Sequence, residues 1–328
     1  MPTPPPPPRT LLPDPRLSPR FAGLVTFGRY PRLADVPAES RPVDWAVLGV
    51  PFDTGVTFRP GARFGPRAIR EASQTVRRYS LEHKVDIAQV LSLADAGDAP
   101  VLPFDLEGTL RGLTEFALGL GDAKRTRLLA LGGDHSLSYP LIKAAFLRRG
   151  APRGGIGLVH FDSHLDTVDR VWDSPWSHAS PFRRAIEDGL INPKRMFSFG
   201  IKGPINTPGD LDFARKHGIT VLSQPELDAG DPVKAAAAAA RKLGSGPVYL
   251  TFDVDCVDPA YAPGTGTPAV GGMRSATALA MLRALRGINL VGADVVEVLP
   301  DRDVAGITAL LAAQVGFEVL ALDAATRK

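Results

Sequence analysis

Asp162, His164 and Asp166 follow one apolar run of the chain at a spacing that suits metal binding. They come directly after Ile156–Phe161, at positions i, i+2 and i+4. On an extended segment alternate side chains point to the same side, so these three groups are expected to converge. Carboxylates gathered at the end of a buried strand are costly unless a cation lies between them. The spacing therefore predicts a metal site rather than a solvated turn.

Two other apolar runs end in residues of the same kinds. His135 follows the run Leu128–Leu131 after two glycines, which permit a tight turn and a close approach of the backbone. Asp253 and Asp255 follow the run Val248–Phe252 and share one face of it. Ligands of parallel α/β sheets bind beyond the carboxyl ends of the strands. The three segments are therefore expected to form one site with four carboxylates and two imidazoles.

This set of donors predicts two divalent cations. Four clustered carboxylates repel one another, and some would have to take up protons in the absence of a counter-charge. Oxygen and nitrogen donors without sulfur favour Mn²⁺, with Ni²⁺ or Co²⁺ as alternatives that bind such donors more tightly. They disfavour a structural zinc site of the cysteine type and an all-oxygen calcium cage. A pair of such ions can lower the pKa of a shared water, so the chemistry expected is hydrolysis.

The bulk composition argues against several other classes of protein. The only cysteine, Cys256, can form neither an internal disulfide nor a thiolate metal site, and we interpret it as a core residue. The net charge is +3 without a block of five or six like charges, so we expect no nucleic-acid partner. We find no apolar run of the roughly 20 residues that a membrane span needs, and no secretory signal. We expect a cytoplasmic enzyme without a membrane partner.

Short apolar runs alternate with helical stretches along most of the chain. Runs of this length and composition are typical of strands buried on both faces, and their alternation with helices predicts a parallel α/β sheet covered on both sides. The predicted strands are Trp45–Val50, Val90–Ala94, Leu128–Leu131, Ile156–Phe161, Met196–Ile201, Ile219–Leu222, Val248–Phe252 and Asn289–Val298. The predicted helices are Pro66–Arg78, Leu106–Ala123, Ser138–Arg149, Ser180–Asp188, Asp210–His217, Pro232–Leu243, Ser275–Arg286 and Ile307–Asp323.

The N-terminal part of the chain differs from the rest. Residues 1–20 are rich in proline, which fixes φ and removes a hydrogen-bond donor. We predict that residues 1–43 form a proline-rich, disordered N-terminal arm and lead-in. We predict that residues 44–328 form a single catalytic domain, because no linker or internal repeat interrupts them.

Three motifs are similar to the signature motifs of the ureohydrolases, the superfamily of arginase and agmatinase. They are GGDHS at 132–136, HFDSHLD at 160–166 and TFDVDCVDP at 251–259. The resemblance continues in PFDTGVTFRPGARFGPRAIR (51–70), DAGD (95–98), SHASPFRRA (177–185), PGTGTP (263–268) and GADVVEVLP (292–300). It spans about residues 44–323 and favours the agmatinase branch. It implies an arginase-like three-layer αβα fold with an eight-stranded, mainly parallel sheet, and a homo-oligomer, either a trimer or a hexamer.

The resemblance also implies roles for individual residues. The implied metal ligands are His135, Asp162, His164, Asp166, Asp253 and Asp255. Asp162 and Asp253 would bridge the two ions, and Asp166 is also placed to hold a proton briefly during the reaction. His178 falls where the superfamily has a histidine that shuttles protons. Glu297 falls where the superfamily holds the substrate guanidinium.

These features predict a binuclear-metal hydrolase that cleaves a guanidino compound to urea and an amine. Agmatine is the favoured substrate, and guanidinobutyrate or another small guanidine is the alternative. The loop 167–176 offers Asp169 and Asp173 to an amine and Arg170 to a carboxylate. Two rival classes are a metal-dependent deacetylase and a non-catalytic partner subunit. The absence of adjacent histidines argues against the first, and the complete set of ligands argues against the second.

Overall fold

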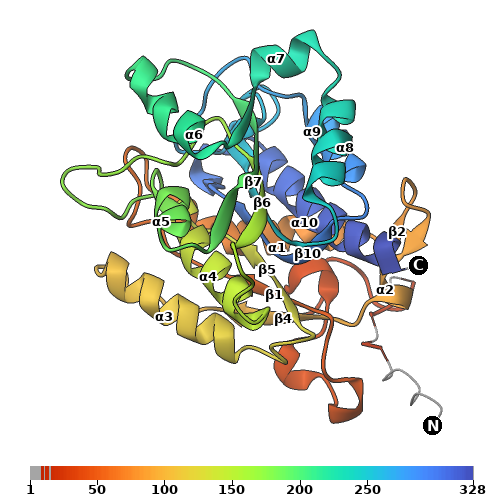
Figure 1. Ribbon diagram of the computed structural model, residues 1–328. Coiled ribbons are helices and arrows are strands. Elements are labelled where there is room, and N and C mark those ends of the chain that lie inside the picture. Colours follow the sequence, from red (N-terminus) through yellow and green to blue (C-terminus); the bar gives the residue numbers. More distant parts are fainter. Residues whose placement is uncertain (1–8, 11, 15, 328) are drawn as a thin grey trace.

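The computed structural model describes residues 9, 10, 12–14 and 16–327, and an eight-stranded sheet lies at its centre (Figure 1). The strand order is β4-β1-β5-β10-β9-β6-β7-β8, and every neighbouring pair is parallel. The strands are β1 (Trp45–Gly49), β4 (Leu93–Asp98), β5 (Arg127–Leu131), β6 (Ile156–Phe161), β7 (Ile191–Ile201), β8 (Thr220–Ser223), β9 (Pro247–Asp253) and β10 (Asn289–Val296). All eight predicted strands are confirmed as members of this sheet.

Helices cover both faces of the sheet, which confirms the three-layer αβα architecture. One layer contains α1 (Gly65–Ala72), α8 (Pro232–Leu243), α9 (Ser275–Ala284) and α10 (Ile307–Arg327). The other contains α3 (Leu106–Gly119), α4 (Ser138–Arg148), α5 (Pro181–Glu187) and α6 (Asp212–His217). Alternate residues of β1 enter the two cores: Trp45 and Val47 pack on the first side, and Ala46 and Leu48 on the second. This alternation explains why β1 is apolar at every position.

Several short elements differ from the expectation. The predicted run from Val90 begins as a strand only at Leu93, because Ile87–Val90 forms the four-residue helix α2, in which the backbone N–H of Ala88 donates to the Asp86 side chain. Helix α7 (Gln224–Ala229) and the hairpin of β2 (Tyr79–Ser80) and β3 (Val85–Asp86) were not predicted. Elements of this length contain too few residues to show a hydrophobic period.

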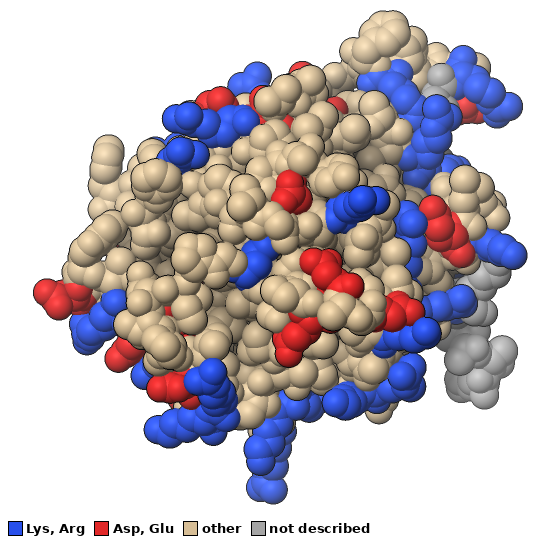
Figure 2. Space-filling view, turned by 90° about the horizontal axis from the view of Figure 1, so that it is seen from above, with Lys and Arg blue, Asp and Glu red and all other residues tan. Residues whose placement is uncertain are grey.

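Helix α10 is long and apolar enough to cross a membrane by length and composition alone. However, 83% of its most apolar 18-residue window is buried inside the protein, which is typical of a core helix. Its polar residues have partners there: Glu318 accepts hydrogen bonds from Arg283, and Asp323 accepts one from Trp45 Nε1. On the face of the protein shown in Figure 2, basic and acidic side chains are interspersed.

Part of the predicted N-terminal arm packs against the domain. The Phe27 side chain is fully buried, and its ring lies so close to Gly316 of α10 that a Cβ there would come within 2.9 Å of it. Thr10 Oγ1 exchanges hydrogen bonds with the backbone of Leu93 on the edge strand β4. Residues 1–8, 11 and 15 lie outside the described residues. The domain boundary after residue 43 stays a prediction.

We predict that the Phe27→Ala variant loses about 3–5 kcal/mol of unfolding free energy, because it leaves a cavity in the core. Phe21→Ala is the matched control, since the Phe21 side chain is 94% exposed. The control should change stability by less than about 0.5 kcal/mol. Equilibrium denaturation in urea measures both variants. Equal, small losses would show that the lead-in does not contribute to the core.

Candidate metal centre and substrate cavity

The six predicted metal ligands meet at the carboxyl edge of the sheet. Strands β5, β10, β9 and β6 are consecutive in its centre, so the loops that follow them are neighbours. His135 Nδ1 lies 2.9 Å from Asp166 Oδ2, 3.1 Å from Asp162 Oδ2 and 3.4 Å from Asp253 Oδ2. All four side chains are buried. One imidazole nitrogen and three carboxylate oxygens therefore surround one small volume.

A second group shares Asp162 with the first. His164 Nδ1 lies 3.3 Å from Asp162 Oδ1 and 3.1 Å from Asp255 Oδ2. The two carboxylate oxygens of Asp162 thus face different imidazoles. This is the arrangement needed for a carboxylate that bridges two cations.

The loop after β6 brings its side chains together by a different route from the one expected. The strand ends at Phe161, and Asp166 has a left-handed backbone with φ of 51°. A turn, rather than continued alternation along an extended segment, therefore directs Asp166 toward His135. The convergence is as predicted, but the chain reaches it through a bend at Ser163 and His164 rather than through an extended segment.

The hydrogen bonds of His135 leave a lone pair aimed at the carboxylates. Thr251 Oγ1 donates its one proton to Asp294, so it must accept the hydrogen bond from His135 Nε2, 2.8 Å away. Nδ1 of the neutral ring is then unprotonated, and it is buried without a hydrogen-bond partner. A lone pair facing three carboxylates is repulsive unless a cation lies between them. The donor set of this site therefore fits a metal ion.

The pKa values of the buried carboxylates and of His135 reflect the same repulsion in the absence of a cation. Burial raises the pKa of Asp253 well above its usual value, and the charges of Asp255 and Asp162 raise it further. Burial and Asp162 likewise raise the pKa of Asp166. Burial lowers the pKa of His135, but the neighbouring carboxylates of Asp162, Asp166 and Asp253, which would pair with a protonated ring, outweigh burial and raise it well above its usual value. The protein alone thus favours extra protons where a metal ion would supply positive charge.

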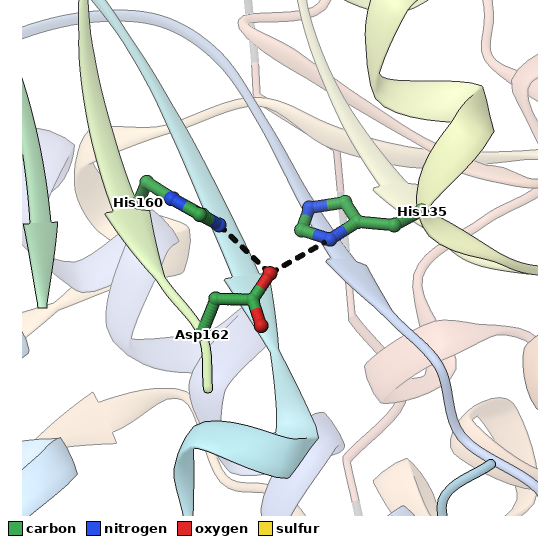
Figure 3. Close-up of side chains that lie close together, drawn as sticks. All are labelled: His135, His160 and Asp162. Atoms are coloured by element: carbon green, nitrogen blue, oxygen red, sulfur yellow. Dashed lines mark hydrogen bonds and ion pairs between the residues drawn. The ribbon is translucent and has the colours of Figure 1, made fainter. Parts of the chain in front are cut away.

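His160 also contacts this centre, and the sequence analysis missed it. His160 Nε2 lies 2.8 Å from Asp162 Oδ2, which His135 approaches from the other side (Figure 3). His160, His135 and Asp162 lie close enough together to hold a metal ion between them. The signal was present, because His160 stands two positions before Asp162 on the same face of β6. Asp294 was missed as well, although one carboxylate within an apolar strand needs a partner.

Glu297 and His178 form a pair beside the metal centre. Glu297 Oε1 accepts a hydrogen bond from the backbone N–H of His135 and lies 2.9 Å from His178 Nδ1. Glu297 Oε2 is buried and has no hydrogen-bond partner among the described residues. The other ring nitrogen of His178 accepts the backbone N–H of Thr57 at 3.0 Å. Glu297 therefore has one anchored oxygen and one that is free to bind a ligand.

The electrostatic surroundings of His178 favour its protonated form. Burial lowers the pKa of this imidazole, but the adjacent Glu297 carboxylate outweighs burial, and the net effect raises the pKa to about 9. The backbone N–H of Thr57 opposes protonation of His178, because it donates to Nε2 and so requires a lone pair on that nitrogen. The proton on this histidine is thus controlled by the charge state of Glu297.

A cavity of about 600 Å³ opens from the metal centre to the surface. Its base includes His164, Asp166 and Asp253, and His178 lies in its wall. The outer part is lined by charged residues of both signs, namely Asp169, Arg170, Arg183, Lys202 and Asp210. This volume suits a small molecule that reaches Asp166 and Asp253 with one end and the charged lining residues with the other.

Comparisons with known proteins agree with this geometry. A family model described as the arginase family matches residues 43–322. Guanidinopropionase from Pseudomonas aeruginosa is 45% identical over 305 residues, which cover 93% of each chain. Mitochondrial agmatinase from Gallus gallus is 39% identical over 92% of this chain and 86% of its own length. The solved structure of proclavaminate amidinohydrolase from Streptomyces clavuligerus, 38% identical, superposes with a TM-score of 0.87 and covers 94% of this chain and 100% of its own.

We predict that protein stripped of metal by a chelator takes up two Mn²⁺ ions per chain and gains thermal stability. Binding to the folded state alone contributes about 2.7 kcal/mol when free metal is 100 times Kd. Metal titration by calorimetry, followed by thermal unfolding, measures both effects. Asp253→Asn should lose at least one ion, whereas the exposed control Asp35→Asn should bind as wild type does. Uptake of no ion by the wild-type chain would contradict the metal site.

Proposed function

The chain belongs to the arginase family of amidinohydrolases, and we propose that it hydrolyses a short guanidino acid such as 3-guanidinopropionate. The products would be urea and 3-aminopropanoate. The observation that carries this proposal is which of the charged residues lining the outer end of the cavity already have hydrogen-bond partners and which can still bind a ligand. Agmatine, which the sequence analysis favoured, is the second candidate because of the similarity to an agmatinase.

The acidic residues at this outer end are already engaged. Asp169 accepts a hydrogen bond from Arg184 Nη2 at 2.5 Å. Asp210 accepts hydrogen bonds from the backbone N–H groups of Asn206 and Thr207 at the start of a helical turn. Both carboxylates already have hydrogen-bond partners, which weakens their attraction for the terminal ammonium group of agmatine.

Arg170 is the basic group most available to a ligand. Its guanidinium lines the cavity, is exposed, and donates to the backbone carbonyl of Asp173. Its remaining N–H groups can bind a carboxylate through two parallel hydrogen bonds. By contrast, Lys202 Nζ is occupied by Ser163 Oγ and by the carbonyls of Asp255 and Cys256. The outer end of the cavity therefore suits an acid better than an amine.

We propose that all six sequence-predicted ligands bind two Mn²⁺ ions. His135 and Asp166 would serve one ion, His164 and Asp255 the other, and Asp162 and Asp253 both. Two bound cations supply a water of lowered pKa and neutralise the charge that develops on the substrate. Assembly into a trimer or hexamer stays a prediction.

Glu297 is proposed to hold the guanidinium group. Its free oxygen, Oε2, can accept a charged N–H in a buried setting, where such hydrogen bonds are strong. Because Oε1 stays anchored to His135 N and His178, the carboxylate needs no rearrangement to bind. The guanidinium carbon is thereby held next to the metal centre.

His178 and Asp166 are proposed to move protons. When a guanidinium cation binds Glu297, the effect of that carboxylate on His178 weakens, and the pKa of the imidazole falls. His178 is then prepared to give its proton to the departing amine. Asp166, whose pKa is raised by burial and by Asp162, is suited to hold a proton between the attack of water and the loss of the amine.

We predict that Mn²⁺-loaded protein releases urea from 3-guanidinopropionate with a higher kcat/KM than from 4-guanidinobutyrate, agmatine or arginine. Arg170→Gln should lower kcat/KM for the acids roughly 10- to 100-fold, since a hydrogen bond to a charged group contributes about 1.5–3 kcal/mol. The same variant should leave activity toward agmatine unchanged or higher.

Arg111→Gln on the exposed face of α3 is the control for loss of one positive charge. Preference for agmatine by the wild-type enzyme would contradict the proposed substrate while leaving the amidinohydrolase assignment intact. An equal loss on acids and agmatine would show that Arg170 supports the loop rather than reading the carboxylate.

We predict that Glu297→Gln lowers kcat/KM by about 10²–10³, because it removes the charge that pairs with a buried guanidinium, worth about 3–5 kcal/mol. Thermal stability should be unchanged or higher, because the carboxylate has a buried oxygen without a partner. Urea release and thermal unfolding measure the two effects, and metal content should stay at the wild-type value. Activity close to wild type would exclude Glu297 from substrate binding.

A further inference from the structure

We propose that His160 is a positioning residue of the metal centre, which holds the shared carboxylate of Asp162 through its Nε2–H while the Ser198 hydroxyl donates to its Nδ1. The inference rests on the proposed function, since it concerns how this chain prepares its metal ligands. It assigns a role to a buried imidazole that neither binds substrate nor belongs to the six predicted ligands.

The position of His160 restricts what it can contact. It lies within β6 and its side chain is fully buried. Its Nε2 lies 2.8 Å from Asp162 Oδ2 (Figure 3). The centroid of the Phe182 ring lies 4.5 Å from the centroid of the His160 ring. Water therefore has little access to this hydrogen bond. In a buried, apolar setting a charge-assisted hydrogen bond is strong, and its loss is costly.

Ser198 sits directly opposite His160 on the neighbouring strand β7. Its hydroxyl oxygen lies 3.1 Å from His160 Nδ1. If Nδ1 carried the proton, the lone pair of Nε2 would face the carboxylate oxygen of Asp162 at 2.8 Å, which is repulsive. When the serine hydroxyl donates to Nδ1 instead, Nε2 carries the proton and donates to Asp162. Both contacts of the ring are then favourable.

This hydrogen bond fixes the residue on which both halves of the centre depend. Asp162 Oδ2 faces His135 Nδ1 at 3.1 Å, and Asp162 Oδ1 faces His164 Nδ1 at 3.3 Å. A rotation of the carboxylate would displace a donor of each ion. The backbone N–H of His164 holds Oδ1 at 2.6 Å, so His160 supplies the matching hydrogen bond to Oδ2.

His160 is not needed as a metal ligand itself. The volume beside His135 Nδ1 already has three carboxylate oxygens within 3.4 Å. Four protein donors plus solvent suffice for a divalent ion of this type. We therefore interpret His160 as a hydrogen-bond donor to a ligand, comparable with the Thr251–Asp294 pair that orients His135.

The test compares Mn²⁺ affinity and the paramagnetic resonance spectrum of the coupled ion pair in four variants. His160→Ala should weaken binding of both ions about 10- to 100-fold, as expected when a hydrogen bond to a ligand is lost. His160→Gln keeps an N–H near the position of Nε2 and should restore most of the affinity and the spectrum. Ser198→Ala should cause a smaller loss. His83→Ala is the control for removal of a buried imidazole elsewhere in the chain.

Two outcomes would overturn the proposal. Wild-type affinity and spectrum in His160→Ala would show that Asp162 needs no such support. Loss of one ion per chain in both His160→Ala and His160→Gln would identify His160 as a ligand. Circular dichroism checks that the variants are folded. If His160→Ala does not fold, the comparison of His160→Gln with the wild-type protein still tests the proposal. Urea release by the wild-type enzyme tests the proposed function separately, because the affinities can be compared even if no substrate is hydrolysed.

Discussion

Mutual repulsion among buried carboxylates is the constraint on which the rest of this structure depends. Asp162, Asp166, Asp253 and Asp255 are all at least nine-tenths buried and lie around two imidazoles. Without a counter-charge they can persist only by taking up protons, and the raised pKa values of Asp166 and Asp253 reflect this. Binding of divalent ions removes the conflict. Folding and metal binding are therefore linked at this edge of the sheet.

The sheet supplies the rigidity that such a site requires. Four consecutive central strands end at the site, and the groups that orient the ligands lie one or two residues back within those strands. Thr251 is in β9, Asp294 in β10 and His160 in β6. Their backbones are fixed by the hydrogen bonds of the parallel ladder, so their side chains can hold His135 and Asp162 at defined angles.

The sequence predicted the parts of this arrangement that have a strong local signal. Each central strand of the sheet contains a mostly apolar run, and every proposed ligand stands near the end of such a run as a charged or imidazole residue. His160 has a weaker signal, its spacing two positions before Asp162, since a histidine inside an apolar strand also suits an ordinary core position. Whether it contacts Asp162 or Ser198 depends on the pairing of β6 with β7 and on the rotamer of Asp162. The packing of Phe27 on α10 was hidden for a similar reason, because it joins residues almost 290 positions apart.

The site also retains features that reduce stability. Asp166 and Glu297 both have left-handed backbones, with φ of 51° and 65°, and such conformations cost about 1–3 kcal/mol each in residues other than glycine. Glu297 additionally has a buried oxygen without a partner. These costs fall on the residue that would bind the guanidinium and on a ligand that would also hold a proton. A ligand that donates to Glu297 Oε2 would remove the cost of the unpartnered oxygen, whereas the cost of the two left-handed backbones stays in the fold. A chain selected for stability alone would replace Glu297, and its persistence in this geometry is best explained by a ligand that needs the free oxygen.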